Sequence, residues 1–465
     1  MLRRSSRPRA SRALSAPSAA RFFTLAAQGV LMASWLLPAT KPLAAQEAPV
    51  AFTGARVIPI AGAPIENGVV VVEGGRITAV GGPGTRVPDG ATTVDAGGKV
   101  IMPGLVDTHS HVGGPSGGDQ SAPTHPDARA LDAVDVRSDG FWRARAGGIT
   151  TANVMPGSGL LMSGQTVHLK LRKDPRTVED WLFCEDPLRD VCGSMKMANG
   201  TNSMRQPPAP GTRGKSAAVV RQQYIQAQEH LEKLQDDRAG ATPPPRNLPM
   251  EALVEILEGK RIVQFHSHRH NDISTLLRLG REFGFTPVIQ HGSEAWKVAD
   301  EIAAAGTSVS LTFIDSFGGK EEALGWTMES GAILERAGVP VSFNTDDGIT
   351  DSRFLMRGAA MSVRYGMSRE AALAGLTLVP ARQLGLEDRI GSLEVGKDAD
   401  LILLSGDPLS VYTKVEEVWV EGEKVFDLDD PEHREYAVGG YRVYDDFSAQ
   451  HAHDEAAALH AGEWR

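Results

Sequence analysis

Short apolar runs separated by turn residues dominate both ends of this chain. In residues 67–82, NGVVVVEGGRITAVGG, two apolar runs are joined by Gly74-Gly75, a pair that predicts a β-hairpin. The same texture returns near the other end in DADLILLSGDP and VEEVWVEGEKVF. We therefore expect one small β-sandwich domain built from both chain ends, over residues 47–103 and 392–445.

Residues 104–391 alternate strand-like apolar runs with amphipathic segments. The apolar runs are GLVDTHSH, ITTANVMPG, TVHLKLR, SMKMANG, RIVQFHSH, TPVIQHG, TSVSLTF and VPVSFNTD. Segments such as DISTLLRLGREFG and EAWKVADEIAAAG have helical spacing and end in glycine, a common helix C-terminus. Strands that alternate with helices predict an α/β fold, here a (β/α)8 TIM-like barrel inserted between the two halves of the β domain.

An insertion at about residues 200–250 follows the fourth strand of the predicted barrel. It contains the proline-rich QPPAPGTRG, a helix-like segment over residues 215–237, and ATPPPRN. Two interpretations stay open, namely a lid on the substrate side of the barrel and a surface excursion without a role.

The first 46 residues differ from the rest because they contain arginine and lysine but no acidic residue. The apolar run FFTLAAQGVLMASWLLPA follows, and small residues then lead to Ala45 and Gln46. This order predicts a signal peptide over residues 1–46 and an exported protein, periplasmic or secreted. An organelle transit peptide and an uncleaved membrane anchor are the alternatives.

Composition narrows the class of protein. The chain has 465 residues, 41% of them hydrophobic, and a net charge of −10, which indicates a soluble globular protein and gives no reason to expect nucleic acid as a partner. Its two cysteines, Cys184 and Cys192, form either one local disulfide or two unpaired thiols. We expect a small-molecule substrate, no membrane partner after cleavage of the signal, and leave a homo-oligomer open.

Titratable side chains gather where the predicted barrel strands end. They are His109 and His111 on the first strand, Lys196 on the fourth, His266 on the fifth, His291 on the sixth and Asp346 on the eighth. Residues two apart in a strand face the same side, so both imidazoles of the first strand can reach one ion. Imidazole and carboxylate are ligands of zinc and similar divalent metals, and active sites of barrels lie at this end of the strands. One or two divalent ions, with zinc foremost, are the expected cofactor.

In this order, PGLVDTHSH, Lys196, FHSH, QHG and NTDD resemble the metal-dependent amidohydrolase superfamily. LGLEDRIGSLEVGKDADLILLSGDP resembles the stretch that closes the barrel in that superfamily, and the likeness covers about residues 50–430. FHSHRHNDISTLLRLGREFGFTPVIQHG is most similar to the imidazolonepropionase-related group and its dipeptidase-like relatives.

The resemblance implies a role for each of these side chains. His109, His111 and Asp346 would hold a first metal, and His266 and His291 a second. Lys196 would be carboxylated and bridge the two, because a free lysine is protonated near neutral pH and is a poor ligand. Asp346 and His291 are the expected catalytic residues, with Asp346 passing a proton from the attacking water to the leaving nitrogen.

Three neighbouring side chains have weaker indications. His268 shares a strand face with His266, so it would contact substrate or support a ligand. Arg269 would bind a substrate carboxylate or lie at the surface where a helix starts. Asp347 should point away from Asp346 and is not expected to be a ligand.

The expected reaction is hydrolysis of a C–N bond, in an amide, cyclic amide or peptide-like substrate, by a metal-activated hydroxide. The alternatives are a mononuclear deaminase or lactonase on the same barrel, and a non-catalytic binding relative. A deaminase would need a glutamate soon after His266, and HSHRHND contains none.

Overall fold

The computed structural model describes residues 48–115, 117–204, 207–236, 238, 242–313 and 320–438. The predicted signal peptide and the last residues of the predicted β domain lie outside these ranges. The helices within the described ranges are all too short or too polar for a bilayer span.

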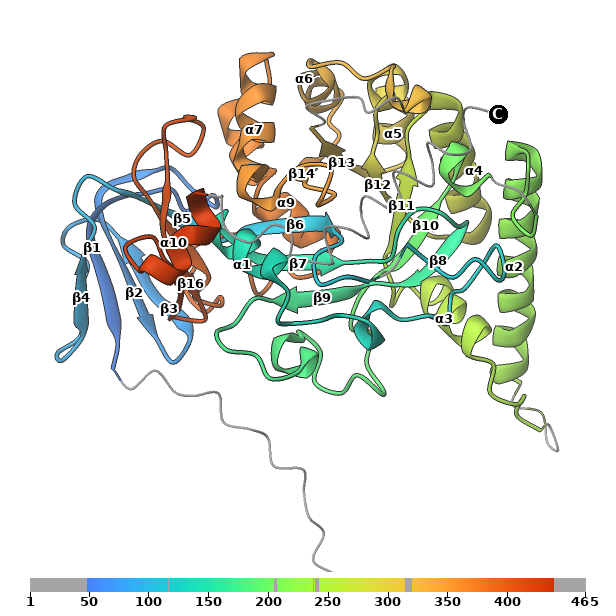
Figure 1. Ribbon diagram of the computed structural model, residues 1–465, viewed down its shortest axis with the longest axis horizontal. Helices are drawn as coiled ribbons and strands as arrows, with labels where there is room; N and C mark the ends of the chain where they lie inside the picture. Colours follow the sequence, from blue (N-terminus) through green and yellow to red (C-terminus); the bar gives the residue numbers. More distant parts are fainter. Residues whose placement is uncertain are drawn as a thin grey trace, which may run out of the picture. The chain divides into compact units, whose positions relative to one another are not determined.

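Strands from both chain ends form one eight-stranded sheet, drawn in blue and red in Figure 1. Its order is β17-β16-β15-β5-β1-β2-β3, with β4 paired to β1. The strands are β1 (Val50–Val57), β2 (Ile65–Glu73), β3 (Arg76–Gly81), β4 (Thr92–Asp95), β5 (Val100–Pro103), β15 (Leu401–Leu404), β16 (Val415–Val420) and β17 (Glu423–Asp427). The two ends join where β5 pairs antiparallel with β15. One sheet from both ends is therefore found, while a separate domain and its division into a two-sheet sandwich stay predictions.

The hairpin expected at Gly74-Gly75 is confirmed. Glu73 of β2 pairs with Arg76 of β3, and the two glycines between them have φ values of 58° and 76°. A two-residue turn with positive φ at both positions matches the twist of the flanking strands, and glycine adopts it without steric cost.

Each of the eight apolar runs of the middle region contains a strand. The strands are β6 (Leu105–Ser110), β7 (Ile149–Val154), β9 (Val167–Lys170), β10 (Met195–Ala198), β11 (Val263–Ser267), β12 (Pro287–His291), β13 (Ser308–Thr312) and β14 (Val341–Asn344). With the additional β8 (Met162–Gln165), they form a six-stranded sheet β14-β13-β12-β11-β10-β8 and a three-stranded sheet β6-β7-β9. The strands β10 to β14 run parallel in chain order, as expected.

The expectation of eight parallel strands is wrong for the third one. Strand β9 runs antiparallel to β7, and β8 runs antiparallel to β10. Parallel neighbours need a crossover of about a dozen or more residues, usually a helix. No helix lies between β7 and β9, so the chain returns alongside β7 in the opposite direction. Complete closure of a barrel is thus a prediction, although Asp346 N donates to His109 O at 2.9 Å and joins the ends of β14 and β6.

Helices follow most strands of the six-stranded sheet. The described helices are α1 (Asp139–Ala146), α2 (Arg213–Leu234), α3 (Leu248–Leu257), α4 (His270–Phe283), α5 (Ala299–Ala304), α6 (Ser330–Arg336), α7 (Leu355–Arg364), α8 (Arg369–Ala374), α9 (Leu378–Gln383) and α10 (Pro431–Val438). Helix α4 buries Ile273, Leu276 and Phe283 at helical spacing and ends at Gly284 with a φ of 77°.

The predicted insertion after β10 contains helix α2, so the helix expected within it is confirmed, and α3 begins where the insertion ends. Helix α2 packs on α4 through Tyr224, whose ring stacks on those of Phe283 and Phe285 at centroid distances of 5.0 and 5.1 Å. This packing fixes at least one face of the insertion to the rest of the fold. Between β9 and β10, Cys184 and Cys192 are joined by a disulfide, which decides the alternative that the sequence left open.

A buried ion cluster lies where β9 meets the eight-stranded sheet. Lys170, at the end of β9, contacts the carboxylates of Asp398, Asp400 and Glu421, and the last of these also binds Arg172 at 2.6 Å. Lys170 pairs with the start of β7, far from the strand ends that carry the histidines. We call this group the Lys170 ion cluster. It links the middle region to the β domain through charge pairs.

Candidate metal centre

Two groups of potential ligands lie at the carboxyl ends of the middle strands. In each group, one donor atom per residue lies within 4.8 Å of the others. The first group is His109, His111 and Asp346, and the second is His266, His268 and His291. The two groups adjoin, because the rings of His109 and His291 are 4.7 Å apart between centroids. The structure therefore brings together every histidine and the aspartate that the sequence placed at strand ends.

The first group forms because β6 points alternate side chains to one face. Asp346 Oδ1 lies 3.0 Å from His111 Nε2 and 3.3 Å from His109 Nε2, so one carboxylate oxygen contacts both imidazoles. The neighbouring Asp347 instead accepts a hydrogen bond from Ser352 N at 2.9 Å, in agreement with the expectation that it points away.

Lys196 extends from β10 toward the first group. Its side chain is fully buried, and Nζ lies 2.9 Å from His109 Nε2 and 3.2 Å from Met155 Sδ. The lysine therefore lies beside a predicted ligand, as the resemblance requires.

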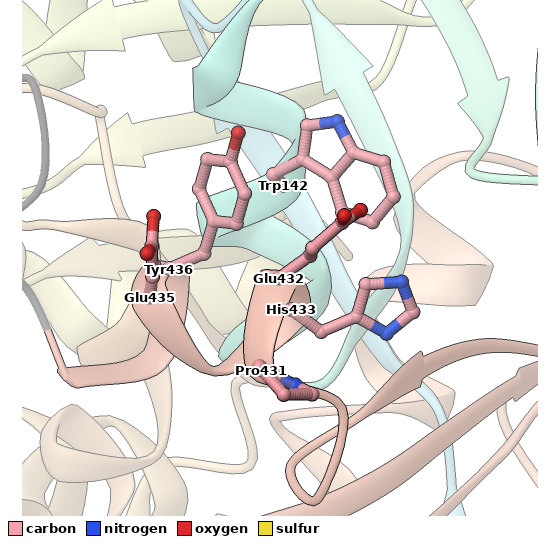
Figure 2. A pocket seen from close by; sticks show the side chains of 6 residues that line it. All are labelled: Trp142, Pro431, Glu432, His433, Glu435 and Tyr436. Carbon is pink, nitrogen blue, oxygen red and sulfur yellow. The ribbon is translucent and has the colours of Figure 1, made fainter.

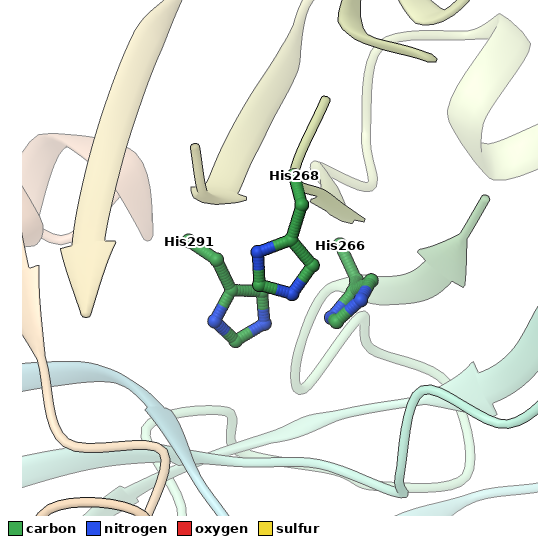
Figure 3. A group of neighbouring side chains, drawn as sticks. All are labelled: His266, His268 and His291. Atoms are coloured by element: carbon green, nitrogen blue, oxygen red, sulfur yellow. The ribbon is translucent and has the colours of Figure 1, made fainter. Parts of the chain in front are cut away.

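The second group comes from β11, β12 and the residue that follows β11 by one position (Figure 3). Ring centroids are 4.3 Å apart for His266 and His291 and 4.6 Å apart for His266 and His268. His268 is thus part of the cluster itself. Arg269 is the half-buried N-cap of α4 and belongs to neither group.

Four of the five histidines share one feature, an oxygen within hydrogen-bond distance of Nδ1. The oxygens belong to Gln290 for His109 (3.3 Å), Met155 for His111 (2.8 Å), Ser293 for His268 (2.7 Å) and Thr312 for His291 (2.8 Å). An N–H on Nδ1 leaves Nε2 as the bare nitrogen, which is the form that binds a metal.

The buried ring nitrogens of the second group suit a divalent metal. His291 Nε2 and both ring nitrogens of His266 are buried and have no hydrogen-bond partner within the described part of the chain. A buried polar atom without a partner costs about 1–3 kcal/mol, so native proteins rarely keep one without a use. Imidazole nitrogens beside a carboxylate form the donor set that zinc and similar metals prefer.

Burial sets the charge state of this centre. It lowers the pKa of His109, His266, His268 and His291 well below the ordinary value, so these imidazoles are neutral at neutral pH. Burial alone would raise the pKa of Asp346, but the neighbouring histidines lower it well below the ordinary value. Neutral imidazoles and an ionised carboxylate are the protonation states that metal binding requires.

One residue beneath the centre titrates differently. Burial raises the pKa of Asp107 to about 7, against the effect of its hydrogen bonds with Thr345 and the backbone of His109. Asp107 Oδ1 accepts from His109 N at 3.1 Å and from Thr345 N at 3.3 Å, and the second bond ties strand β6 to the residue that precedes Asp346. Asp107 thus helps to place two ligand-bearing segments against each other.

Two site residues were missed by the sequence analysis, Lys320 and Glu322. Both follow β13, in and next to the short helix η5 (Glu321–Ala323). Lys320 Nζ lies 2.9 Å from His268 Nε2, and the buried Glu322 places Oε1 3.9 Å from His266 Nε2. The sequence around them, KEEALGW, has neither helical nor strand periodicity, so only the end of a predicted strand nearby could have pointed to it.

A pocket of about 380 Å³ lies elsewhere, between α1 and α10 (Figure 2). Its lining consists of Trp142, Pro431, Glu432, His433, Glu435 and Tyr436. The pocket shares no residue with the two ligand groups, and Trp142 stacks on Tyr436 with ring centroids 5.5 Å apart. Donor chemistry, rather than hollow volume, therefore locates the candidate active site.

Comparison with known proteins agrees with this geometry. Residues 240–426 match the model of the amidohydrolase family. A crystal structure of an amidohydrolase from Thermotoga maritima MSB8 has 35% identical sequence and a TM-score of 0.76, over 81% of this chain and 100% of that one. The chain belongs to the amidohydrolase family. The predicted metal-dependent hydrolase acting on C–N bonds is confirmed at this level.

Other proteins similar to this chain, at lower sequence identity, have names that describe different reactions. Amidohydrolase tasK of Hapsidospora irregularis is 29% identical over 391 residues, which are 77% of this chain but only 40% of that protein. A 5-methylthioadenosine/S-adenosylhomocysteine deaminase from Symbiobacterium thermophilum is 27% identical over 397 residues, 76% of this chain and 84% of the deaminase. An imidazolonepropionase from Thermoplasma acidophilum is 24% identical over 390 residues, 73% of this chain and 83% of that enzyme, which confirms the predicted resemblance to that group.

Proposed function

We propose that this amidohydrolase hydrolyses small peptide-like amides, dipeptides and N-acyl amino acids foremost, with zinc held by the two ligand groups. The observation that carries the proposal is the pair of adjoining groups of imidazoles, four of the five neutral, around one ionised carboxylate, with buried ring nitrogens that lack a partner in the described ranges. Groups with shifted pKa values that converge in this way mark sites of chemistry.

In this proposal His109, His111 and Asp346 hold one metal ion, and His266 and His291 hold a second. A bound divalent metal polarises a carbonyl oxygen and lowers the pKa of water to about 7. His268 is positioned by Ser293, because its Nδ1 lies 2.7 Å from Ser293 Oγ. Its Nε2 lies 2.9 Å from Lys320 Nζ, so a substrate or a metal that used this nitrogen would displace the lysine.

Asp346 is suited to move the proton. Its carboxylate is ionised, retains 18% of its side-chain surface exposed, and places Oδ2 3.7 Å from His291 Nδ1. It can accept a proton from the attacking water and deliver it to the leaving nitrogen as the C–N bond breaks, so the carboxylate ends the cycle unprotonated. Proton transfer of this kind typically contributes about 10²–10⁴-fold to the rate.

Carboxylation of Lys196 is part of the proposal. A protonated ammonium only donates hydrogen bonds, whereas a carbamate on Nζ offers oxygens to a metal. Support comes from its complete burial and from the 2.9 Å distance to His109 Nε2, which places Nζ at the ligands. Metal per chain, measured by elemental analysis, should fall from two in the wild type to one or none in Lys196→Ala. An unchanged metal content would contradict the bridging role.

Export is the proposed location. The order of basic, apolar and small residues over 1–46 supports a cleaved signal. The disulfide between Cys184 and Cys192 also supports it, since disulfides persist in oxidising compartments and are rare in reducing ones.

A panel of dipeptides and N-acyl amino acids tests the proposed reaction. Purified mature protein should release free amino acid from at least one member of the panel. A chelator should abolish this activity, and zinc should restore it. The matched control is Asp388→Asn, an exposed position that should leave the activity unchanged. Hydrolysis that survives removal of all metal would contradict the proposal.

Hydrolytic deamination is a second candidate because of Glu322. The sequence argument against a deaminase rested on the absence of a glutamate soon after His266. The structure places a buried glutamate beside His266 from another part of the chain, the loop after β13. Release of ammonia from 5-methylthioadenosine or S-adenosylhomocysteine, with no turnover of the dipeptide panel, would favour this candidate over the first.

A further inference from the structure

His266 is the exception among the five clustered histidines. In the other four, an oxygen lies 2.7–3.3 Å from Nδ1 and fixes the orientation of the ring. Neither nitrogen of His266 has a hydrogen-bond partner in the described ranges, although the residue is only 2% exposed. A metal ligand whose ring is not held loses orientation, and ligand histidines almost always donate their second N–H to an oxygen.

The oxygen near His266 belongs to Glu322. Oε1 of this carboxylate lies 3.9 Å from His266 Nε2, is buried, and likewise has no hydrogen-bond partner among the described residues. Two buried polar atoms of complementary type thus face each other slightly beyond the hydrogen-bond range of 2.7–3.2 Å.

The rest of the Glu322 side chain is held in place. Its other oxygen, Oε2, accepts a hydrogen bond from Thr201 N at 2.8 Å. Gly200 makes room for it, because a Cβ at that position would lie 2.5 Å from Oε2, and the φ of Gly200 is 75°. The loop after β10 therefore fixes one carboxylate oxygen and leaves the other directed to His266.

We propose that Glu322 is a positioning residue for the second metal, accepting a hydrogen bond from His266 Nε2–H and so making Nδ1 the ligand atom of His266. This inference rests on the proposed function only in requiring that the second group binds a metal. A metal at Nδ1 fixes the proton on Nε2, and the attraction of the carboxylate for that N–H closes the gap. The carboxylate also raises the basicity of the imidazole, which strengthens its bond to the metal.

Lys320 is the competing partner for the same oxygen. Its Nζ lies 3.8 Å from Glu322 Oε1 and 2.9 Å from His268 Nε2. If Glu322 served to bind Lys320 or the ammonium group of a substrate, its loss would change substrate binding and leave metal affinity intact. The two roles therefore predict different measurements.

The test compares Glu322→Ala and Glu322→Gln with Glu321→Gln, the exposed glutamate next to it in the same short helix. Zinc affinity is measured by competition with a chromophoric chelator on the full mature protein. We expect Glu322→Ala to bind its weaker zinc ion about 10–100-fold less tightly than the wild type. Glu322→Gln, whose amide oxygen can still accept from His266 and from Thr201 N, should lose less, and Glu321→Gln nothing.

Thermal unfolding of the metal-free proteins separates positioning from packing. Metal-free Glu322→Gln, which keeps an acceptor for Thr201 N, should have the Tm of the metal-free wild type. The increase in Tm on adding zinc should be smaller for Glu322→Ala than for the wild type. Wild-type zinc affinity in both Glu322 variants, with or without a raised KM, would overturn the inference while the proposed function stands. The inference would also be overturned if a variant has a lower metal-free Tm and, after correction for that loss of stability, binds zinc with the affinity of the wild type. A wild type that binds no zinc would instead refute the proposed function itself.

Discussion

The metal centre and the Lys170 ion cluster are both buried and polar, and they lie at opposite ends of the middle strands. In the Lys170 ion cluster each carboxylate faces a cation, with Lys170 between Asp398, Asp400 and Glu421. In the metal centre, by contrast, ring nitrogens of His266 and His291 remain without a partner in the described structure. Buried polarity alone thus does not mark a site of chemistry. A set of imidazole nitrogens without partners, gathered beside a carboxylate, does, because that donor set gains from a metal ion.

Replacement of Asp346 by asparagine should have the largest effect. The amide cannot take a proton from water, so kcat should fall about 10²–10⁴-fold. Steady-state kinetics with zinc in excess measures this loss, and the melting temperature of the metal-free variant should change little. A variant with more than a tenth of the wild-type kcat would show that the proton passes through another group.

Replacement of Lys170 by methionine should have the opposite effect to that of the Asp346 variant, with a loss of stability and no loss of the metal site. It leaves Asp398 and Asp400 buried without their shared cation, and breaking a buried pair in this way costs about 3–5 kcal/mol of stability. Urea unfolding measures the loss, while the folded fraction should still bind zinc with wild-type affinity. Unchanged stability would mean that Arg389, 2.8 Å from Asp398, compensates the charge alone.

The smallest effect is expected for the contribution of the Glu421 carboxylate to the free energy of unfolding, which should depend on pH. Burial acts to raise the pKa of Glu421. The hydrogen bond from Arg172 and the charge of Lys170 outweigh this effect and lower the pKa to about 2. The folded pKa lies below the unfolded value of about 4.3, so the stabilisation is complete above that pH and is lost as the pH falls toward 2. The loss should be on the order of 3 kcal/mol.

The free energy of unfolding of the wild type and of Glu421→Gln, measured across this range, checks the prediction. The difference between the two proteins should shrink between pH 4.5 and pH 2. A constant difference would show that Glu421 contributes by packing rather than by charge.

The clustering of the candidate ligands could be predicted from sequence because their spacing obeys local rules. His109 and His111 alternate along one strand, and parallel strands bring their carboxyl ends to one edge, where His266 and His291 also lie. Glu322 could not be predicted in the same way. Its place beside His266 depends on how the loop after β13 meets Gly200 of another loop, a contact that no periodicity encodes.

The third strand shows a second limit of the sequence pattern. The run TVHLKLR was correctly predicted as a strand, but its direction was not, because an apolar run has no direction of its own. Direction follows from the connection, and the segment between β7 and β9 contains a further strand in place of a helix. The connecting segment, rather than the strand, therefore decides the direction of β9.

The sheet that unites the two chain ends also has a consequence for the order of folding. Pro103 of β5 finds its partner Leu401 only after the whole middle region has left the ribosome. Contacts this distant in sequence close slowly, and an unpaired strand edge is prone to aggregation while it waits. During synthesis β5 therefore stays an open edge. Chaperones that hold nascent chains would have their greatest effect on the segment from β1 to β5, and a chain truncated before β15 should be recovered mainly as aggregate.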